Sequence, residues 1–333
     1  MRFSIRLNND LPAQQYITLA QAAENAGFDQ FWVSNDLFLR SAAVILPAVA
    51  QATSRIQIGS CIFNPYTIHP AEIAMFAATM DELSGNRFNL GLAAGAAEFL
   101  KWVGIEQARP LKMMRETIAV IRGLQRGERV SFEGDCLKWS GEAYLRFTAP
   151  RLTPIYLGAM SEGMLRLAGE VCDGALPLLF PPEHYFGVKP LIDEGIRRRD
   201  ARLTKSFDFA ACIWVSIDAD GAAARRVLAQ KVAYYGHALS PLIYERLGLQ
   251  QADFLPIEHA LMVERDEAKA LGMVTDKMLR IGIVGAAADL VARLRPLIEA
   301  GVEHISFGPP LGPDPLKAIE LLGREVLPQF GSA

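Results

Sequence analysis

One short block, residues 59–88, constrains the fold of this chain more than any other part of it. The apolar segment Gly59–Phe63 predicts a strand, and the Asn64-Pro65 pair that follows predicts a turn. Pro70 suits the first turn of a helix, where its missing N–H leaves no hydrogen bond unmade, and Ser84-Gly85 suits the end of that helix. A second strand follows the glycine. The block is therefore predicted to be a strand–helix–strand unit.

The same alternation continues along the whole chain. Helical patterns such as residues 12–26, which carry an apolar stripe of leucine and alanine, separate short strand-like segments. Parallel strands need helical crossovers, so repeated alternation favours an α/β fold of the closed (βα)8 TIM-barrel type, as one domain over residues 1–333. An open doubly wound sheet is the alternative, but no GxGxxG motif follows the first strand. The eight predicted strands are Arg2–Leu7, Gln30–Ser34, Ile56–Ile62, Arg87–Leu92, Pro154–Gly158, Gly174–Leu178, Phe207–Ile217 and His304–Phe307.

Two intervals are longer than a barrel unit needs. Residues 127–150 contain an alternating segment with a Glu133-Gly134-Asp135 turn, which predicts a β-hairpin. Residues 222–275 have a helical pattern. We interpret both as insertions at the C-terminal face of the barrel, where loops and lids usually select the substrate.

Composition excludes several classes of function. Half of the residues are apolar and the net charge is −3, so nothing points to a nucleic-acid partner. The longest apolar stretch, residues 42–50, is too short to span a bilayer, and the N-terminus does not resemble a signal peptide. We therefore expect a soluble cytoplasmic protein. Its cysteines are widely spaced and suit reduced thiols better than disulfides or a metal site: Cys61, Cys136, Cys172 and Cys212.

Ordered segments along nearly the whole chain resemble the bacterial-luciferase-like superfamily. They are the block at 59–88, Pro154–Met164, Ala168–Ala175 and the C-terminal Phe307–Asp314. Within the superfamily the chain is most similar to the coenzyme F420-dependent methylenetetrahydromethanopterin reductases. The resemblance implies an oxidoreductase that binds coenzyme F420 or FMN at the C-terminal ends of the strands. It implies hydride transfer to or from a small organic substrate.

The resemblance also implies a homodimer formed through the second and third units. Ser41–Ala52 has an Ala-rich apolar face suited to such packing. That face could equally be the one that every barrel helix buries against its strands.

The turn after Gly158 joins a strand to a helix that begins near Glu162. Backbone N–H groups converge at a helix N-terminus, where the helix dipole is positive, and this arrangement suits a phosphate group. An ordinary strand-to-helix turn is the alternative. The resemblance implies that the turn holds the phosphate of FMN or F420, through Gly158, Ala159, Met160, Ser161 and Gly163.

The ends of the third and fourth strands form a second candidate region. The resemblance implies that Ser60, Cys61, Ile62 and Phe63 support the cofactor ring. It also implies a non-proline cis peptide between Ser60 and Cys61, a bond that costs about 3–4 kcal/mol. A regular buried strand with a packed cysteine is the alternative. In the fourth-strand turn, small residues including Gly95 would let a cofactor approach the backbone.

Three residues are weak catalytic candidates: Arg6, Asp36 and His69. Relatives commonly have Asp-His after the second strand, where this chain has Asn35-Asp36. Asn35 can hydrogen-bond a cofactor ring and Asp36 can transfer a proton if burial raises its pKa, but both also suit a polar loop and helix cap. His69 stands at the start of the third helix, where a histidine is more often structural.

Two positions depart from the methanopterin reductases, whose Glu and Asp at these positions act on the pterin. Arg6 and Ala96 stand there instead and cannot reproduce paired carboxylates that handle protons. Arg6 can pair with an anionic substrate group, or with Asp10 or Asp36 as a structural ion pair. Glu98 follows Ala96 and is more typical of a solvated helix residue. We therefore expect a substrate other than methylenetetrahydromethanopterin.

A non-catalytic flavin- or deazaflavin-binding barrel is the alternative function, and a barrel without any cofactor is a third. The sequence contains no GxSxG, HExxH or P-loop motif and no metal-carboxylate cluster, so we expect no bound metal.

Overall fold

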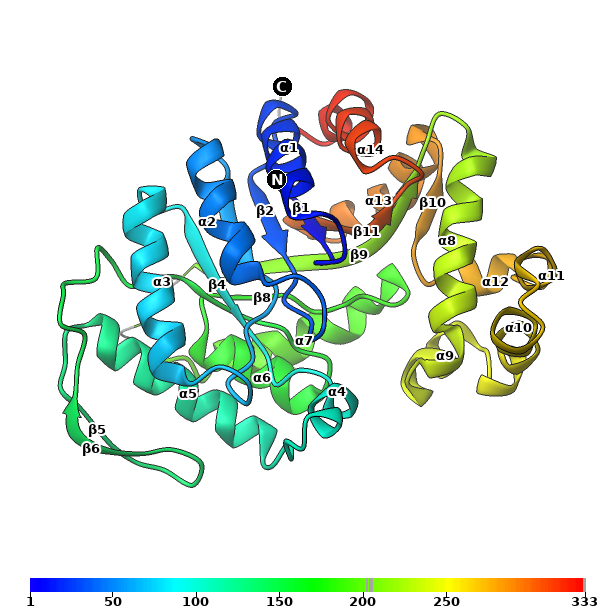
Figure 1. The fold of residues 1–333 in the computed structure, drawn as a ribbon. Coiled ribbons are helices and arrows are strands. Elements are labelled where there is room, and N and C mark those ends of the chain that lie inside the picture. The colour runs from blue at the N-terminus through cyan, green and yellow to red at the C-terminus, as the bar shows by residue number, and fades with distance from the viewer. Residues whose placement is uncertain (202, 204–205, 332–333) are drawn as a thin grey trace.

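Eight parallel strands close into a barrel in a computed structural model of the chain (Figure 1). The structure describes residues 1–201, 203 and 206–331, and the remaining residues of the predicted domain 1–333 lie outside the described part. Hydrogen bonds run in the order β1-β2-β3-β4-β7-β8-β9-β11 and return to β1. The predicted TIM barrel is confirmed. Its strands are β1 (Arg2–Leu7), β2 (Gln30–Val33), β3 (Gln57–Ser60), β4 (Phe88–Leu92), β7 (Ile155–Leu157), β8 (Gly174–Ala175), β9 (Asp208–Ile217) and β11 (His304–Leu311).

Helices surround the barrel on its outer side (Figure 1). One further strand, β10 (Ile283–Gly285), pairs with the end of β9 outside the closed ring. The sequence analysis missed β10 because three residues are too few to show strand alternation. The α-helices are α1 (Ala13–Asn25), α2 (Ala42–Ala52), α3 (Pro70–Ser84), α4 (Ala97–Trp102), α5 (Pro110–Gln125), α6 (Glu162–Val171), α7 (Tyr185–Ile196), α8 (Gly221–Tyr235), α9 (Pro241–Leu247), α10 (Leu255–Glu258), α11 (Glu267–Gly272), α12 (Asp276–Leu279), α13 (Ala287–Glu299) and α14 (Pro315–Leu321).

The block at residues 59–88 folds as predicted. Pro70 is the first residue of α3, and Gly85 ends that helix with a φ of 66°, in the left-handed region that favours glycine. The strand β4 follows directly.

Strand residues alternate between two environments, as the two-residue period of a strand requires. Ile5 and Phe31 face outward and are fully buried in the large core between the strands and the helices. Trp32, Tyr156 and Cys212 belong to a separate buried cluster inside the barrel. The barrel is therefore packed with side chains along its axis.

A polar network fills the interior at the amino ends of the strands. The Asp208 carboxylate accepts hydrogen bonds from His304 Nδ1 at 2.9 Å and from the Tyr156 hydroxyl at 2.7 Å, and Arg2 Nη1 lies 3.0 Å from it. His304 Nε2 in turn lies 2.9 Å from Ser4 Oγ. Because a carboxylate only accepts, His304 Nδ1 carries the proton of its hydrogen bond to Asp208. This network closes one end of the barrel, so a ligand can enter only at the other.

The hairpin predicted within residues 127–150 is present. It consists of β5 (Val130–Glu133) and β6 (Lys138–Ala143), which pair antiparallel. The Glu116 carboxylate of α5 accepts the N–H groups of Asp135, Cys136 and Leu137 at 2.8–2.9 Å, which ties the turn to the barrel helix.

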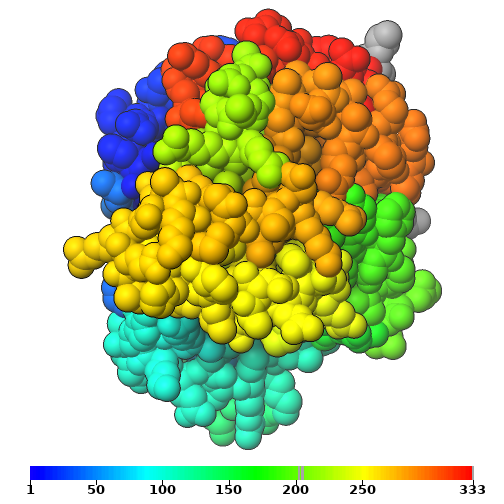
Figure 2. Space-filling view, turned by 90° about the vertical axis from the view of Figure 1, so that its right-hand side faces the viewer, coloured from blue at the N-terminus to red at the C-terminus, as the bar shows by residue number. Residues whose placement is uncertain are grey.

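The predicted helical segment, residues 222–275, contains most of α8 and all of α9, α10 and α11. These helices enclose a second hydrophobic cluster, which includes Leu228, Phe254 and Met278 and is separate from the main core. The segment, yellow to gold in Figure 2, covers the middle of one face of the molecule. In Figure 1 the segment lies on one side of the barrel and includes the helix labelled α8.

The apolar face of α2 packs on its own barrel. Ile45, Leu46 and Val49 are buried there, whereas Val44 on the opposite side is exposed. The homodimer therefore stays a prediction. Among the described residues, no helix has the length and hydropathy needed to cross a membrane.

Glu24 of α1 joins that helix to the segment before β3. Its carboxylate accepts the N–H groups of Ser54, Arg55 and Ile56 at 2.6–2.9 Å. Partial burial raises the pKa of Glu24, but these hydrogen bonds outweigh it and lower the pKa to about 2. We expect Glu24→Gln to reduce the free energy of unfolding by about 1–2 kcal/mol at pH 7, measured by urea denaturation.

The stabilisation of the folded protein by Glu24 should decrease at acidic pH. A lowered pKa in the folded state stabilises the protein above the ordinary value of 4.5, and the stabilisation is lost as pH falls toward 2. The difference between wild type and Glu24→Gln should therefore shrink below pH 4.5. Glu82→Gln, on an exposed position of α3, is the matched control. An equal loss of stability in both variants would contradict the assignment.

Candidate active site

The carboxyl ends of β3, β4 and β7 bring three backbones very close together. The Ser60 hydroxyl donates to the Gly91 carbonyl oxygen at 3.1 Å and accepts from the Gly91 N–H at 3.0 Å. A Cβ at Gly91 would lie 1.9 Å from the Ser60 carbonyl oxygen, so only glycine fits. A Cβ at Gly158 would lie 3.1 Å from the Ala93 Cβ. The carboxyl ends of these strands, which form the rim of the barrel, therefore carry small residues. The Ser60 hydroxyl is engaged in hydrogen bonds to the Gly91 backbone.

A non-proline cis peptide lies between Cys61 and Ile62. The predicted position, Ser60–Cys61, was wrong by one bond. The reason is that pairing with β2 continues through Cys61, whose N–H donates to the Val33 carbonyl at 2.8 Å, so the chain leaves the ladder only after that residue. Cys61 and Ile62 are half-buried and pack against the cluster inside the barrel, at its upper end.

Two other residues predicted to contact the cofactor, Phe63 and Gly95, pack against the protein itself. The Phe63 side chain is buried in the outer core, edge-on to Phe76 with ring centroids 5.0 Å apart, so only its backbone lies at the rim. Gly95 is exposed and has a φ of 76°. A Cβ there would lie 2.2 Å from Asn64 Nδ2, so the turn needs glycine for the approach of this side chain.

The turn before α6 has the geometry of a helix N-terminus. Ser161 is the N-cap, and its hydroxyl accepts the Met164 N–H at 3.4 Å. The first N–H groups of any helix have no intrahelical partner and point outward. Glu162 turns toward Arg166, which lies 3.0 Å away, and Gly163 leaves open space beside the helix start. Ala159 is buried, whereas Met160 is exposed beside it.

The loop after β2 is held by buried Asn9. Its Nδ2 donates to the Asp36 carbonyl at 3.1 Å, and its Oδ1 accepts the Asp36 N–H at 3.2 Å. Asn35 Oδ1 accepts the Ala42 N–H at 3.1 Å, which confirms the helix-cap interpretation of this side chain. Asp36 lies at the mouth of the barrel, where part of the residue is open to solvent.

Four charged groups influence one another at this mouth. Burial raises the pKa of Asp36, although Arg6 and Lys231 oppose the rise and Asp10 adds to it. Burial also lowers the pKa of Lys231 to about 8, and the Arg6 charge adds to this effect. Lys231 can therefore change charge closer to neutral pH than an exposed ammonium would, and the pKa of Asp36 is shifted in the direction of neutral pH as well.

Arg6 is 5 % exposed and reaches into the barrel from β1. A Cβ at Gly308 would lie 2.3 Å from Arg6 Nη2, so the guanidinium occupies the space that this glycine leaves. Among the described residues, Arg6 forms no ion pair with Asp10 or Asp36, so the structural ion pair is not what holds it.

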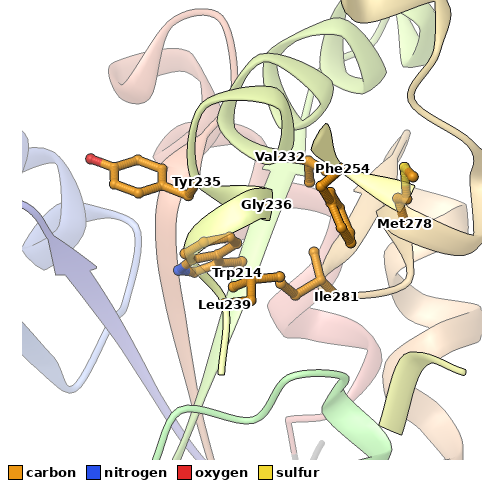
Figure 3. A pocket seen from close by; sticks show the side chains of 8 residues that line it. All are labelled: Trp214, Val232, Tyr235, Gly236, Leu239, Phe254, Met278 and Ile281. Carbon is orange, nitrogen blue, oxygen red and sulfur yellow. The ribbon is translucent and has the colours of Figure 1, made fainter. Parts of the chain in front are cut away.

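Trp214 of β9 lies next to Gly308 in the register of β9 and β11. Lys231 Nζ sits 4.6 Å from the centroid of the Trp214 ring and 5.4 Å from that of Tyr235. In Figure 3, Tyr235 points away from Phe254, beside a narrow apolar hollow that has no room for a water molecule. The other residues around the hollow come mainly from the helical segment: Val232, Gly236, Leu239, Met278 and Ile281.

Neither Trp214 nor Lys231 was predicted as a site residue. Lys231 lies in the middle of a helical pattern and Trp214 in a strand, and neither is part of a local motif. Only the fold brings them to the mouth of the barrel.

His69 lies away from this charged group. Its Nδ1 accepts the Ala71 N–H at 3.2 Å at the start of α3, and its ring stacks on Trp139 of the hairpin at 5.8 Å. The structural interpretation of His69 is therefore confirmed. Glu98 is exposed in the first turn of α4, which begins directly after Ala96.

A closed parallel barrel with a helix N-terminus, small residues and charged side chains at the carboxyl ends of its strands is typical of TIM-barrel enzymes. Comparison with known proteins identifies the family. The chain belongs to the luciferase-like monooxygenase family, whose model matches residues 1–304.

The relatives agree with the predicted resemblance. The chain is 34% identical to a 5,10-methylenetetrahydromethanopterin reductase of Archaeoglobus fulgidus, over 99% of this chain and 100% of the relative. It is 35% identical to the same enzyme of Methanolobus tindarius, over 98% and 100%. The solved coenzyme F420-dependent tetrahydromethanopterin reductase of Methanopyrus kandleri superimposes with a TM-score of 0.90 at 30% identity, over 99% of each chain. The relatives' names are those of oxidoreductases.

Proposed function

We propose that the chain is an oxidoreductase that binds coenzyme F420 or FMN at the mouth of the barrel and transfers a hydride to or from a small organic substrate. The observation that carries this proposal is the TM-score of 0.90, over 99% of both chains, with a coenzyme F420-dependent reductase. For the same reason we favour F420 over FMN.

The residues at the mouth fit such a cofactor. Gly91 and Gly158 keep the ends of β3, β4 and β7 close together at the rim where the ring is proposed to lie. The first turn of α6 supplies N–H groups for a phosphate, through the segment Gly158–Gly163. When bound, either cofactor supplies hydride chemistry, which amino-acid side chains lack.

The protein's own part is to position, to exclude water and to hold protons. Cys61, Ile62 and Trp214 would border the ring with largely apolar surfaces. Lys231, whose pKa is about 8, can hold or release a proton at Nζ near neutral pH. Asp36 can accept a proton more readily than an ordinary aspartate because its pKa is raised.

The substrate is proposed to differ from methylenetetrahydromethanopterin. The resemblance implies that Arg6 and Ala96 stand where the methanopterin reductases carry acids, and the buried Arg6 guanidinium cannot act as a proton-accepting carboxylate. Residues 127–150 and 222–275 are proposed as insertions that shape this substrate site within a single domain. The cytoplasmic location also stays a prediction.

Cofactor titration tests the proposal. Purified protein is titrated with F420 and with FMN, and binding is followed by absorption and fluorescence, since the two cofactors have different bands. We expect one F420 per chain, bound more tightly than FMN, and F420 reduction or oxidation with candidate substrates. Tight binding without turnover on any substrate would favour the non-catalytic alternative. Failure to bind either cofactor would contradict the proposal.

A further inference from the structure

The guanidinium of Arg6 has an unused hydrogen-bonding edge. Nε and Nη2 are both shielded from solvent, and neither has a hydrogen-bond partner among the residues that the structure describes. A guanidinium stays charged at physiological pH, and burying a charge without partners is strongly unfavourable. The arrangement is therefore incomplete unless another molecule supplies the partner.

The neighbouring side chains leave Arg6 without an ion pair among the described residues, although Arg6 shares a side-chain hydrogen bond with Cys212 and its charge acts on Asp36. Cys61 and Cys212 lie close enough for Arg6 to act on both thiols, but burial raises the pKa of each, and that of Cys61 reaches about 12. Both are therefore neutral at pH 7. Asp36 is near enough for the Arg6 charge to act on it but forms no ion pair with Arg6 within the described part of the chain.

The free edge has the geometry of a carboxylate receptor. Nε–H and one N–H of Nη2 are parallel donors, which match the two oxygens of a carboxylate. Another arginine of this protein binds a carboxylate in this way. Arg293 Nε and Nη2 donate to the two oxygens of Glu183 at 2.6 and 2.8 Å. Arg6 has the same donors inside the barrel without the acid.

A second cation borders the same place. Lys231 is only half-buried, it lies close enough to Arg6 for the two charges to interact, and within the described residues it has no ion pair. Its side chain rests on the Trp214 ring, 4.6 Å from the centroid. Because the edge of Arg6 is shielded, a ligand must shift a side chain at the mouth, and Lys231 is a flexible one that can move with the ligand and pair with it.

We propose that Arg6, with Lys231 beside it, binds a carboxylate group of the substrate, so that the substrate is a small organic acid. This inference rests on the proposed function, because the anion is taken to be part of the molecule that reacts at the cofactor. It names the class of substrate that Arg6 would select.

The test measures anion binding separately from cofactor binding. Thermal melting of the purified protein is followed with increasing malonate, neutral malonamide and inorganic phosphate, with and without F420. We expect malonate to raise the melting temperature in a saturable way, malonamide to have no effect, and phosphate to bind more weakly. Arg6→Met should weaken malonate binding at least tenfold while F420 binding stays within threefold of wild type.

Two further variants keep the result interpretable. Arg126→Met removes an exposed arginine that uses the same edge on Glu128, and it should bind malonate as wild type does. Lys231→Met should weaken malonate binding less than Arg6→Met does. Without malonate, Arg6→Met should melt at or above the wild-type temperature, because it removes an unpaired buried charge.

Several outcomes would overturn the inference. They are equal malonate binding by wild type and Arg6→Met, tighter binding of phosphate than of malonate, and a melting temperature of Arg6→Met clearly below that of wild type. Loss of F420 binding in Arg6→Met without any malonate effect would assign the guanidinium to the cofactor instead. Failure of wild type to bind F420 would count against the proposed function, whereas malonate binding by the free protein would still support an anion site at Arg6.

Discussion

Asp208→Ala is expected to lower the free energy of unfolding by about 3–5 kcal/mol, a large part of the stability of a typical domain. Asp208 is the common acceptor of the polar network inside the barrel, 2.9 Å from His304 Nδ1 and 2.7 Å from the Tyr156 hydroxyl. Alanine leaves both donors buried without a partner and leaves Arg2 without its carboxylate. Urea denaturation of wild type and variant at pH 7 measures the difference.

The pH dependence provides a second check on Asp208. Burial raises the pKa of this carboxyl, but His304, Tyr156 and Arg2 outweigh burial and lower it well below the ordinary value. The carboxylate therefore stabilises the folded protein above pH about 4, and this contribution is lost as the solution becomes more acidic. Glu299→Ala, on an exposed position of α13, is the control and should change stability by less than about 0.5 kcal/mol. An effect of Asp208→Ala no larger than that of the control would show that the network is dispensable.

Gly163→Asp is expected to weaken cofactor binding about thirtyfold to hundredfold, from roughly 2–3 kcal/mol of repulsion at about 6 Å and an effective dielectric constant of about 20. Gly163 is the second residue of α6, and a Cβ there meets only Leu111 at 3.6 Å, so the side chain fits. A new carboxylate would lie beside the position where the phosphate is proposed to bind and would repel its charge. Fluorescence titration with F420 measures the change.

The same substitution should not destabilise the protein. Replacing glycine inside a helix, and placing an acid in its first turn, each contribute about 0.5–1 kcal/mol in favour of folding. Gly163→Asn has nearly the same shape without the charge, and it should bind F420 within about threefold of wild type. A higher melting temperature together with a lower F420 affinity would show that Gly163→Asp acts on cofactor binding and does not act by destabilising the fold. If Gly163→Asp binds F420 as tightly as wild type does, the phosphate does not bind at the start of α6.

The local features of the fold could be read from the sequence. Pro70 and Gly85 bound α3 as predicted, and the hairpin at β5 and β6 lies where its turn indicated. The strand β10 was missed because it is too short to show a period. The cis peptide was placed one bond too early because only the pairing of Cys61 with Val33 decides where the strand leaves its ladder.

The site was less predictable than the fold. Asn35 and Ser60 were expected to face a cofactor, yet their polar atoms are engaged in capping α2 and in joining β3 to β4. Lys231 was not expected at all. A side chain's hydrogen-bond partner depends on residues far away in the chain, and the sequence pattern carries no information on them.

The barrel itself was determined by the sequence, because alternation of strands and helices with two distinct periods acts through neighbours along the chain. The chemistry of its mouth was decided by the tertiary structure. Arg6, Asp36, Trp214, Lys231 and Gly308 meet only when the last strand pairs with the first, and that closure leaves Nε and Nη2 of the buried Arg6 guanidinium without a hydrogen-bond partner among the described residues.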